Sequence, residues 1–269
     1  MNKVVKLSSD PADELSALKS QFLATLSYEI RTPLAGILGM LDLMLETSLN
    51  EEQAEYAAAS RQCAESLLQS MNAALEYAAL SAGQVTLEES EFSVRDLFET
   101  ILDTYSKQAS AKGLRFIRDF DPDLPEIVAA DAVRLKQITS SLIDNAIKFT
   151  NRGEVEVQVS SITLADGDML LSISVRDTGI GIAAGKVQFI FDSFRQLDGG
   201  LAKRYGGMGL GLAVTKKLAE LMHAELTVSS VEGQGSVFCV DIPMRAIRDQ
   251  RIRPRTRKRT RRLEPAPAA

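Results

Sequence analysis

Asp177-Thr178-Gly179-Ile180-Gly181-Ile182 follows directly on an alternating apolar segment that predicts a strand over residues 170–176. A carboxylate at the end of a strand can accept a hydrogen bond from an adenine amino group, and the glycines beside it let the backbone approach the ring. Alone, the motif has low specificity, because the same spacing occurs in ordinary turns. It is not a dinucleotide-binding fingerprint, since the next glycine, Gly185, stands at the wrong spacing.

A second glycine-rich stretch, Gly206-Gly207-Met208-Gly209-Leu210-Gly211, opens a helix that is predicted to run to Met222. Backbone N–H groups at the start of a helix form a positive site that suits phosphate groups. In isolation, this cluster would be better explained as a flexible hinge. The sequence contains neither GxxxxGKS nor GxxxxGKT, which excludes a P-loop.

The third element is Asn145-Ala146-Ile147-Lys148-Phe149, at the end of a helix predicted for residues 131–149. Asn145 and Lys148 are three residues apart and therefore share a face of that helix. An amide oxygen is a ligand that Mg²⁺ accepts, and an ammonium group can neutralise a phosphate. A lone pair of this kind is usually only a solvated face, so its weight depends on the other two elements.

The surrounding segments predict one mixed domain over about residues 91–244. Helical periodicity and alternating apolar residues favour a mostly antiparallel α/β sandwich with its helices on one face. The elements expected are a helix over 94–112, strands over 114–120, 155–160, 170–176, 226–230 and 236–242, and turns at 166–168 and 232–235.

The N-terminal part predicts two long amphipathic helices, joined by a short break at residues 47–50. A start signal stands at Ser9-Asp10-Pro11, and the second helix is expected to end near residues 81–83. Two helices cannot bury both apolar stripes by themselves. We therefore expect a dimeric four-helix bundle, with a monomeric hairpin packed on the next domain as the alternative. The stripes consist of Leu15, Leu18, Phe22, Leu26, Ile30, Leu34, Ile37, Leu41 and Leu45, and of Ala57, Ala64, Leu68, Met71, Leu75 and Ala79.

The composition is that of a globular protein, with 45% hydrophobic and 25% charged residues among 269. No apolar run reaches the roughly 18 residues of a membrane span, and the start does not resemble a signal peptide, so we expect a cytoplasmic location. Cys63 and Cys239 stand far apart, which argues against a disulfide framework and a zinc site. The single histidine, His223, argues against a Ser-His-Asp triad.

The net charge of −5 is divided unevenly along the chain. Residues 245–269 hold ten basic and two acidic residues, while the rest of the chain holds 21 basic and 34 acidic ones. This tail has few apolar residues to bury, and we expect it to be disordered. It predicts contact with nucleic acid or an anionic membrane surface, and a tail that only aids solubility is the equally supported alternative.

In this order, the motifs resemble the ATPase domain of two-component sensor histidine kinases, and the resemblance extends over about residues 15–244. Four boxes in order are far more specific than any one of them. The resemblance implies an α+β fold: a helical hairpin that forms a dimeric four-helix bundle, followed by the α/β sandwich of the GHKL, or Bergerat, ATPases. The boxes are found at residues 135–138 and 145–150 (N box), 177–182 (G1), 190–194 (F) and 205–212 (G2).

The resemblance implies that the domain binds ATP with Mg²⁺ under a lid formed by residues 183–208. Asp177 would contact adenine, Asn145 would hold the metal and Lys148 would meet phosphate. One departure is Ser141, where the family usually has a second Asn, and we expect altered nucleotide affinity rather than its loss. The nucleotide-binding residues expected are Asn145, Lys148, Asp177, Gly179, Gly181, Phe194, Gly207, Gly209, Gly211 and Leu212.

The first helix carries Tyr28-Glu29-Ile30-Arg31-Thr32-Pro33-Leu34, which resembles the family's phosphoacceptor box, His-Glu-Ile-Arg-Thr-Pro-Leu. Tyr28 stands at the acceptor position. An imidazole is partly deprotonated and nucleophilic near neutral pH, whereas a tyrosine hydroxyl, with a pKa of about 10, is a poor nucleophile without a strong base. Pro33 removes a helical hydrogen bond and favours a kink beside the acceptor.

Four interpretations of this swap stay open. The chain is a kinase-like regulator that binds ATP and a partner without phosphorylating itself, or it phosphorylates a histidine on a heterodimer partner. Alternatively it is a response-regulator phosphatase, for which Glu29 and Thr32 keep the family's E-x-x-T pattern. In the last interpretation, a histidine was replaced in an otherwise ordinary kinase.

We therefore expect a homodimer that binds the receiver domain of a response regulator near Tyr28. Because no receiver domain follows in this sequence, a partner is expected to supply the aspartate. The catalytic candidates are Tyr28, Glu29 and Thr32. The resemblance divides the chain into an extension (1–12), a dimerisation hairpin (13–84), an ATP-binding domain (90–244) and a basic tail (245–269).

Overall fold

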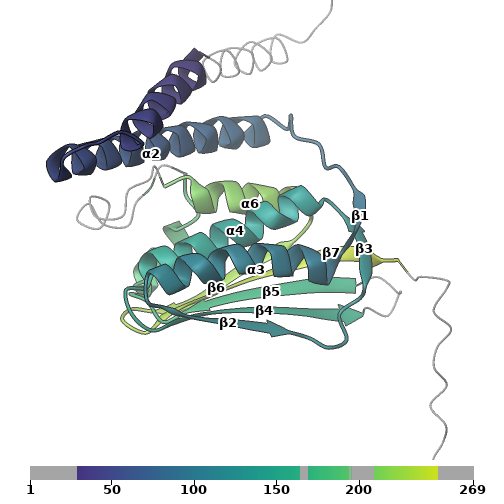
Figure 1. Ribbon diagram of the computed structural model, residues 1–269. Coiled ribbons are helices and arrows are strands. Elements are labelled where there is room, and N and C mark those ends of the chain that lie inside the picture. The colour runs from purple at the N-terminus through teal and green to yellow at the C-terminus, as the bar shows by residue number, and fades with distance from the viewer. Residues whose placement is uncertain (1–28, 164–168, 194, 196–208, 248–269) are drawn as a thin grey trace, which may run out of the picture.

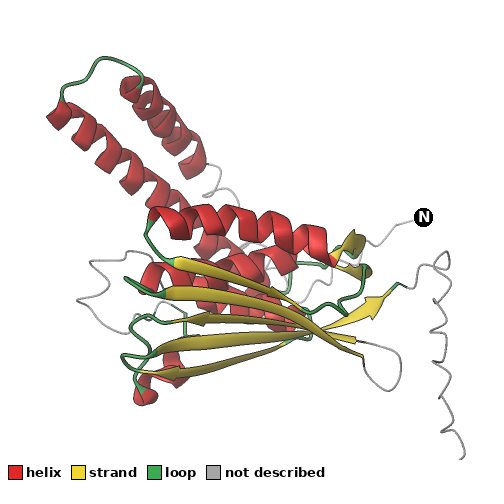
Figure 2. Cartoon of the chain, turned by 60° about the horizontal axis from the view of Figure 1, so that its bottom comes forward, coloured by secondary structure: helices red, strands yellow, loops and turns green. Residues whose placement is uncertain are grey.

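The computed structural model describes residues 29–163, 169–193, 195 and 209–247. A helical hairpin lies against a layered domain, in which helices cover one face of a sheet (Figure 1). The turned view in Figure 2 shows the same two layers, with helices on one side and strands on the other. The order of a hairpin followed by an α/β sandwich is the one that the sequence predicts.

The hairpin consists of a helix at residues 29–45 and of α2 (Glu51–Ser81). α2 begins with a capping box: the Asn50 side chain accepts a hydrogen bond from Gln53 N, and the Gln53 side chain accepts one from Asn50 N. This box explains why the chain breaks at the predicted position and turns into a second helix. The predicted helix start at residues 9–11 lies outside the described residues.

In the described part of the hairpin, two polar contacts join the helices, and few apolar residues are buried. Arg61 Nε lies 2.6 Å from Asp42 Oδ1, and Arg31 Nη2 donates to Asn72 Oδ1 at 3.0 Å. The buried apolar residues of the hairpin are few and mostly small, whereas several large ones remain exposed. Those buried are Leu34, Ala57 and Ala64, and those exposed include Ile37, Met40, Leu43, Met44, Tyr56 and Leu67.

The sheet has seven strands, and six of them follow the order β1-β3-β7-β5-β4-β2. β6 pairs with β7 beside this path, so β7 has β5 on one edge and first β6 and then β3 on the other. All pairings are antiparallel except that of β2 with β4. The strands are β1 (Ser90–Ser93), β2 (Arg115–Phe120), β3 (Ile127–Ala130), β4 (Glu154–Thr163), β5 (Met169–Asp177), β6 (Glu225–Val231) and β7 (Gly235–Ala246).

Three helices, α3 (Val94–Ala111), α4 (Ala132–Phe149) and α6 (Gly211–Leu221), pack on the sheet face that buries the alternating apolar residues (Figure 2). A short 3₁₀ helix, η1 (Ala184–Phe189), follows β5 after the glycine-containing turn. The core lies between these layers. Its fully buried side chains include Phe98 and Leu102 of α3, Leu135, Ile138 and Leu142 of α4, Val155, Val157 and Val159 of β4, and Ile173 and Val175 of β5.

The predicted helices and strands of this domain are confirmed, and the strand ends shift by at most four residues. Two strands, β1 and β3, were not expected, because each has only four residues and too short an apolar alternation to show a period. The predicted turn at residues 166–168 lies outside the described part of the chain. No helix in the described ranges combines the length and the apolarity that crossing a bilayer requires.

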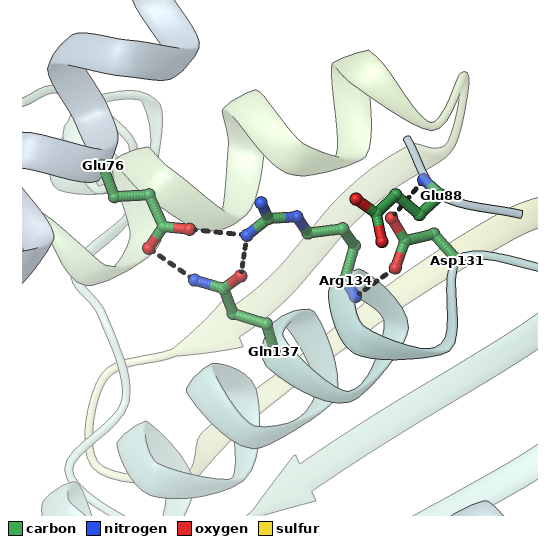
Figure 3. Close-up of polar contacts among 5 residues, drawn as sticks. All are labelled: Glu76, Glu88, Asp131, Arg134 and Gln137. Carbon is green, nitrogen blue, oxygen red and sulfur yellow. Dashed lines mark hydrogen bonds and ion pairs between the residues drawn. The ribbon is translucent and has the colours of Figure 1, made fainter. Parts of the chain in front are cut away.

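A cluster of polar side chains joins α2 to the start of α4 (Figure 3). The Glu76 carboxylate accepts a hydrogen bond from Arg134 Nη1 at 2.9 Å and another from Gln137 Nε2 at 2.5 Å. Arg134 Nη1 also donates to Gln137 Oε1 at 3.0 Å, so the three side chains form a closed network. Tyr77 and Leu80 of α2 pack on the core beside it.

Asp131 ties the same end of α4 to the segment that links hairpin and sheet. Its Oδ1 atom accepts a hydrogen bond from Arg134 N at 3.0 Å and caps the helix. Its Oδ2 atom accepts one from Glu88 N at 2.9 Å, as Figure 3 shows. The two contacts fix the linker at the point where it enters the layered domain.

We predict that Glu76→Ala loosens the hairpin from the layered domain. The substitution leaves Arg134 and Gln137 without their acceptor in a partly buried place, and this should lower the free energy of unfolding by about 1–2 kcal/mol. Hydrogen exchange of the amides at residues 82–89 should also accelerate. The measurement is mass-detected hydrogen exchange together with chemical unfolding.

Glu65→Ala is the matched control, because Glu65 pairs with Arg61 on the exposed surface of α2. Loss of that pair should change stability by less than about 0.5 kcal/mol. Equal effects of the two substitutions would contradict a coupling role for Glu76.

Candidate functional site

Asp177 stands at the end of β5, between the neighbouring strands β4 and β7, and only 6% of it is exposed. Its Oδ1 atom accepts a hydrogen bond from Gly179 N at 2.7 Å. Burial raises the pKa of the carboxyl above its ordinary value, against hydrogen bonds from the Gly179 and Ser236 N–H groups and the Ser236 and Thr150 hydroxyls, which lower it. The carboxyl group is therefore buried, accepts from the Gly179 N–H, and lies close to Ser236 and Thr150 of two other segments.

The turn after Asp177 is fixed by backbone contacts to α4 and to the β6–β7 connection. Ile180 N donates to Phe149 O at 3.3 Å, and Ile180 O accepts from Gly233 N at 2.7 Å. These close backbone approaches explain why residues 179 and 181 are glycines. A Cβ on Gly179 would lie 2.4 Å from Phe149 O, and one on Gly181, which has a φ of 62°, would lie 2.0 Å from a carbonyl oxygen of β6.

The last two turns of α4 bring Asn145 and Lys148 close to this turn. Both side chains are half-buried, and no described residue hydrogen-bonds to the Asn145 amide. Lys148 Nζ lies 5.3 Å from the centre of the Phe149 ring. Burial lowers the pKa of Lys148, while the negative charge of Asp144 raises it.

The start of α6 closes the third side of the site. Thr215 Oγ1 donates to Ser141 Oγ at 2.8 Å. Ser141, which stands where the family usually has Asn, is therefore hydrogen-bonded to α6. Gly211 is the first residue of α6, and a Cβ there would lie 3.8 Å from Ser141 Oγ. Gly209 has a φ of 68° and packs against the backbone of Arg195.

The structure thus brings together most of the predicted nucleotide-binding residues within its described part. Asp177, Asn145 and Lys148 lie around the junction of β5 and α4, and Leu212 packs partly buried in the first turn of α6. Phe194 and Gly207 lie outside the described residues, as does Tyr28. Glu29 and Thr32 are exposed on the helix at residues 29–45.

Three residues of this site were missed by sequence reasoning. Thr150 and Ser236 lower the pKa of the Asp177 carboxyl, and Thr215 donates a hydrogen bond to Ser141. Thr150 closes the N box and had a positional signal. Ser236 and Thr215 carried none, because hydroxyl residues next to strands and in helices are common.

Chemically, the site pairs an acceptor at one end with a cation and a helix start at the other. A buried carboxylate can accept a hydrogen bond from an exocyclic amino group. A half-buried ammonium and the N–H groups at the start of α6 suit phosphates. The Asn145 amide oxygen is a hard ligand that fits Mg²⁺, which usually takes few protein ligands and keeps waters and phosphates. Among the described residues, His, Cys, Asp and Glu form no cluster that could hold a metal.

Two family models match the chain. The His Kinase A (phospho-acceptor) domain matches residues 18–83, and the histidine kinase-, DNA gyrase B- and HSP90-like ATPase family matches residues 130–246. The first match covers the hairpin, and the second covers most of the layered domain. The second includes every predicted nucleotide-binding residue.

Curated relatives extend well beyond this chain. Sensor histidine kinase GacS of Pseudomonas protegens is 37% identical over 248 residues, which are 92% of this chain and 27% of the relative. Hybrid signal transduction histidine kinase A of Dictyostelium discoideum is 38% identical over 244 residues, 88% of this chain and 11% of the relative. The chain therefore spans about a quarter of the first relative's length and about a tenth of the second's.

Solved structures agree with the fold. The crystal structure of full-length ShkA in complex with AMPPNP has a TM-score of 0.71 and 34% identity, and the match covers 84% of this chain and 46% of that one. The histidine kinase AdeS of Acinetobacter baumannii has a TM-score of 0.53 and 21% identity, covering 80% of this chain and 96% of that one. At that identity, AdeS supports the fold alone.

We predict that Asp177→Asn stabilises the protein without ligand near pH 7 by up to about 1 kcal/mol, because it removes a buried charge. The raised pKa means that the folded state holds the Asp177 proton more tightly than the unfolded state does. The contribution of Asp177 to stability is therefore greatest in acid and falls as the pH rises above the ordinary Asp pKa of about 3.9.

Chemical unfolding at pH 4 and at pH 7 measures this difference, which should grow toward pH 7. Asp123→Asn, at an exposed carboxylate, serves as the control and should show no such trend. A variant at Asp177 that is less stable than the parent at pH 7 would contradict the prediction.

Proposed function

This chain belongs to the two-component sensor histidine kinases, and we propose that it binds ATP as a magnesium complex at the site between β5, α4 and α6. The buried carboxylate of Asp177 carries this proposal, because it is a hydrogen-bond acceptor whose burial costs free energy. The matched ATPase family implies the use of ATP. The related ShkA was solved with the nucleotide AMPPNP, which supports the same class of ligand.

Each part of the nucleotide has a counterpart in the site. Asp177 accepts the adenine amino group, and the glycine-containing turn leaves room for the ring. Lys148 and the N–H groups that start α6 at Gly211 meet the phosphates. Asn145 holds Mg²⁺ through its amide oxygen, and the bound ion neutralises phosphate charge. By the family resemblance, Phe194, Gly207, Gly209 and Leu212 complete the binding surface.

We further propose that the chain does not phosphorylate itself, because Tyr28 stands where the family has its acceptor histidine. A tyrosine hydroxyl with a pKa of about 10 is protonated at neutral pH and needs a strong base to attack a phosphoryl group. The chain would then regulate a response regulator by binding its receiver domain in an ATP-dependent state. Transfer to a histidine of a heterodimer partner, and an acceptor-site substitution in an ordinary kinase, lead to the same prediction for the chain alone.

A phosphatase is the second candidate function. Glu29 and Thr32 are both exposed on the helix at residues 29–45, four residues or fewer from Tyr28 in sequence. The Thr32 hydroxyl could orient a water toward a phospho-aspartate without help from a histidine. Loss of this activity in Thr32→Ala, with ATP binding unchanged, would distinguish it from regulation by binding alone.

The hairpin is proposed to form a homodimer through its exposed apolar side chains. Met40 is 67% exposed, Leu43 59% and Leu67 57%, and a contiguous surface of such residues marks an interface. A second hairpin would cover them as a four-helix bundle. Residues 13–84 would then be the dimerisation domain and residues 90–244 the ATP-binding domain, joined by the linker that Asp131 holds.

We predict that the purified chain binds ATP with Mg²⁺ but gains no acid-labile phosphate from γ-labelled ATP. Calorimetry measures binding, and radiolabelling measures phosphate. Asp177→Asn should weaken ATP binding by at least about tenfold, because a hydrogen bond to a charged group contributes about 1.5–3 kcal/mol. No heat with the parent chain, or unchanged affinity in the variant, would overturn the proposed site.

Tyr28→His then distinguishes a lost acceptor from a disabled ATPase domain. Labelled phosphate on this variant would show that the domain is competent and that only the acceptor is missing. Labelling of the parent chain on histidine or tyrosine would contradict the proposed lack of self-phosphorylation. Failure of Tyr28→His to label, with ATP still bound, would direct attention to Ser141.

For the dimer, we predict that Met40→Glu shifts the chain from dimer to monomer in light scattering. A buried, unpaired charge in a helical interface is costly, so the apparent dissociation constant should rise by at least about tenfold. Gln69→Glu, at an exposed polar position of α2, is the control and should leave the dimer intact. A monomeric parent chain would instead favour the hairpin packed on its own ATP-binding domain.

A further inference from the structure

One face of α3 holds the part of α4 that carries the proposed phosphate contacts. Tyr105 lies in α3 and Lys112 follows its last residue, seven positions later, so the two side chains point to the same side. Both reach α4 in its last two turns: Tyr105 meets Asp144, and Lys112 meets the carbonyl oxygens of Ile147 and Lys148. Neither residue belongs to the family's boxes.

Tyr105 is buried, with 8% of its surface exposed, and its hydroxyl donates to Asp144 Oδ2 at 3.0 Å. Burial raises the pKa of Tyr105 to about 12, so the hydroxyl stays protonated and remains a donor at neutral pH. A buried ring has few positions open to it. The hydrogen bond therefore holds the Asp144 carboxylate, which belongs to an exposed residue, against the buried ring of Tyr105.

Asp144 precedes Lys148 by four residues on α4, the spacing at which an acidic and a basic side chain attract each other on a helix. The Asp144 charge favours the charged form of Lys148, against the burial that lowers the Lys148 pKa. A carboxylate held by Tyr105 thus attracts the Lys148 ammonium on the same face of α4.

Lys112 acts on the backbone of the same turn. Its Nζ atom donates to Ile147 O at 2.5 Å and to Lys148 O at 2.9 Å, which are carbonyls at the C-terminal end of α4. A cation at this end also suits the helix dipole. The next carbonyl, of Phe149, accepts from Ile180 N in the turn after Asp177. The turn that Lys112 holds therefore connects the proposed phosphate side of the site to its base side.

We propose that Tyr105 and Lys112 are positioning residues of the nucleotide site: they act through Asp144 and the last turn of α4 to place Lys148 for the phosphates. This inference rests on the proposed function, since it assumes that the site binds ATP. It adds two residues to the proposed site, and both act on α4 from α3 and its end, outside the family's boxes.

A purely structural role for these residues would weaken all ligands alike, whereas positioning of Lys148 changes only what the phosphates add. The experiment therefore compares ATP with Mg²⁺, followed by calorimetry, and adenosine, followed by NMR titration. Tyr105→Phe and Lys112→Met are the test variants. Tyr56→Phe removes an exposed tyrosine–carboxylate hydrogen bond on α2, and Lys107→Met removes an exposed lysine on α3, so these serve as matched controls.

We expect Tyr105→Phe and Lys112→Met each to weaken ATP binding by about fivefold, in line with the loss of one hydrogen bond to a charged or dipolar group. Adenosine affinity should change by less than about twofold. Lys112→Arg, which keeps a cationic donor, should restore ATP affinity. The effect of Tyr105→Phe should disappear when Lys148 is already replaced by Met, because residues that act through one another are not additive.

Equal losses for ATP and adenosine, or none for either, would overturn the proposal and leave Tyr105 and Lys112 as packing residues. An effect of Tyr105→Phe that persists in the Lys148→Met background would also overturn it. Failure of the proposed function looks different, because the parent chain would then bind neither ligand. Tyr105→Phe keeps the buried ring and Lys112 is exposed, so both variants retain the packing of the fold.

Discussion

Asp177 carries a charge that the fold buries at the end of a strand, and the surrounding chain supplies the donors that this requires. The Gly179 N–H donates to it, and Thr150 after α4 and Ser236 in β7 are the other polar residues that stabilise it. Because an unsatisfied buried carboxylate would be far more costly than a paired one, these three segments must meet whether or not a nucleotide is present. The proposed nucleotide site is therefore built around this carboxylate, at the junction of the sheet and α4.

The glycines of the G1 box show how a motif and its physical cause can differ. The sequence suggested that Gly179 and Gly181 leave room for a ring. In the structure, the same residues allow the turn to pass within contact of Phe149 O on one side and of β6 on the other. The two explanations are compatible, since the close passage is what places the turn beside Asp177. The motif identifies the place, but only the packing explains why a side chain is not tolerated there.

Periodicity made most of the layered domain and of the hairpin predictable from the sequence. α4 and β5 have strong apolar patterns, and the chemistry of Asn145, Lys148 and Asp177 stood in motifs of known order. The contacts that hold these residues were not predictable, because they join positions far apart in sequence. Tyr105 lies 39 residues before Asp144, and Glu76 lies 58 residues before Arg134. A local sequence pattern carries no information about such distant pairs, and a Tyr or a Glu on a helix is usually at least partly exposed.

β7 is the last strand of the described chain, yet it lies inside the sheet, with partners on both edges. Until β7 has emerged from the ribosome, β5 lacks one neighbouring strand and Asp177 lacks its contacts with Ser236. The sheet and the contacts of Asp177 with Ser236 are therefore complete only once residues 235–246 have been synthesised. A chain cut short before residue 235 would not be a weaker version of this protein. It would expose apolar surface and be bound by chaperones or degraded by proteases.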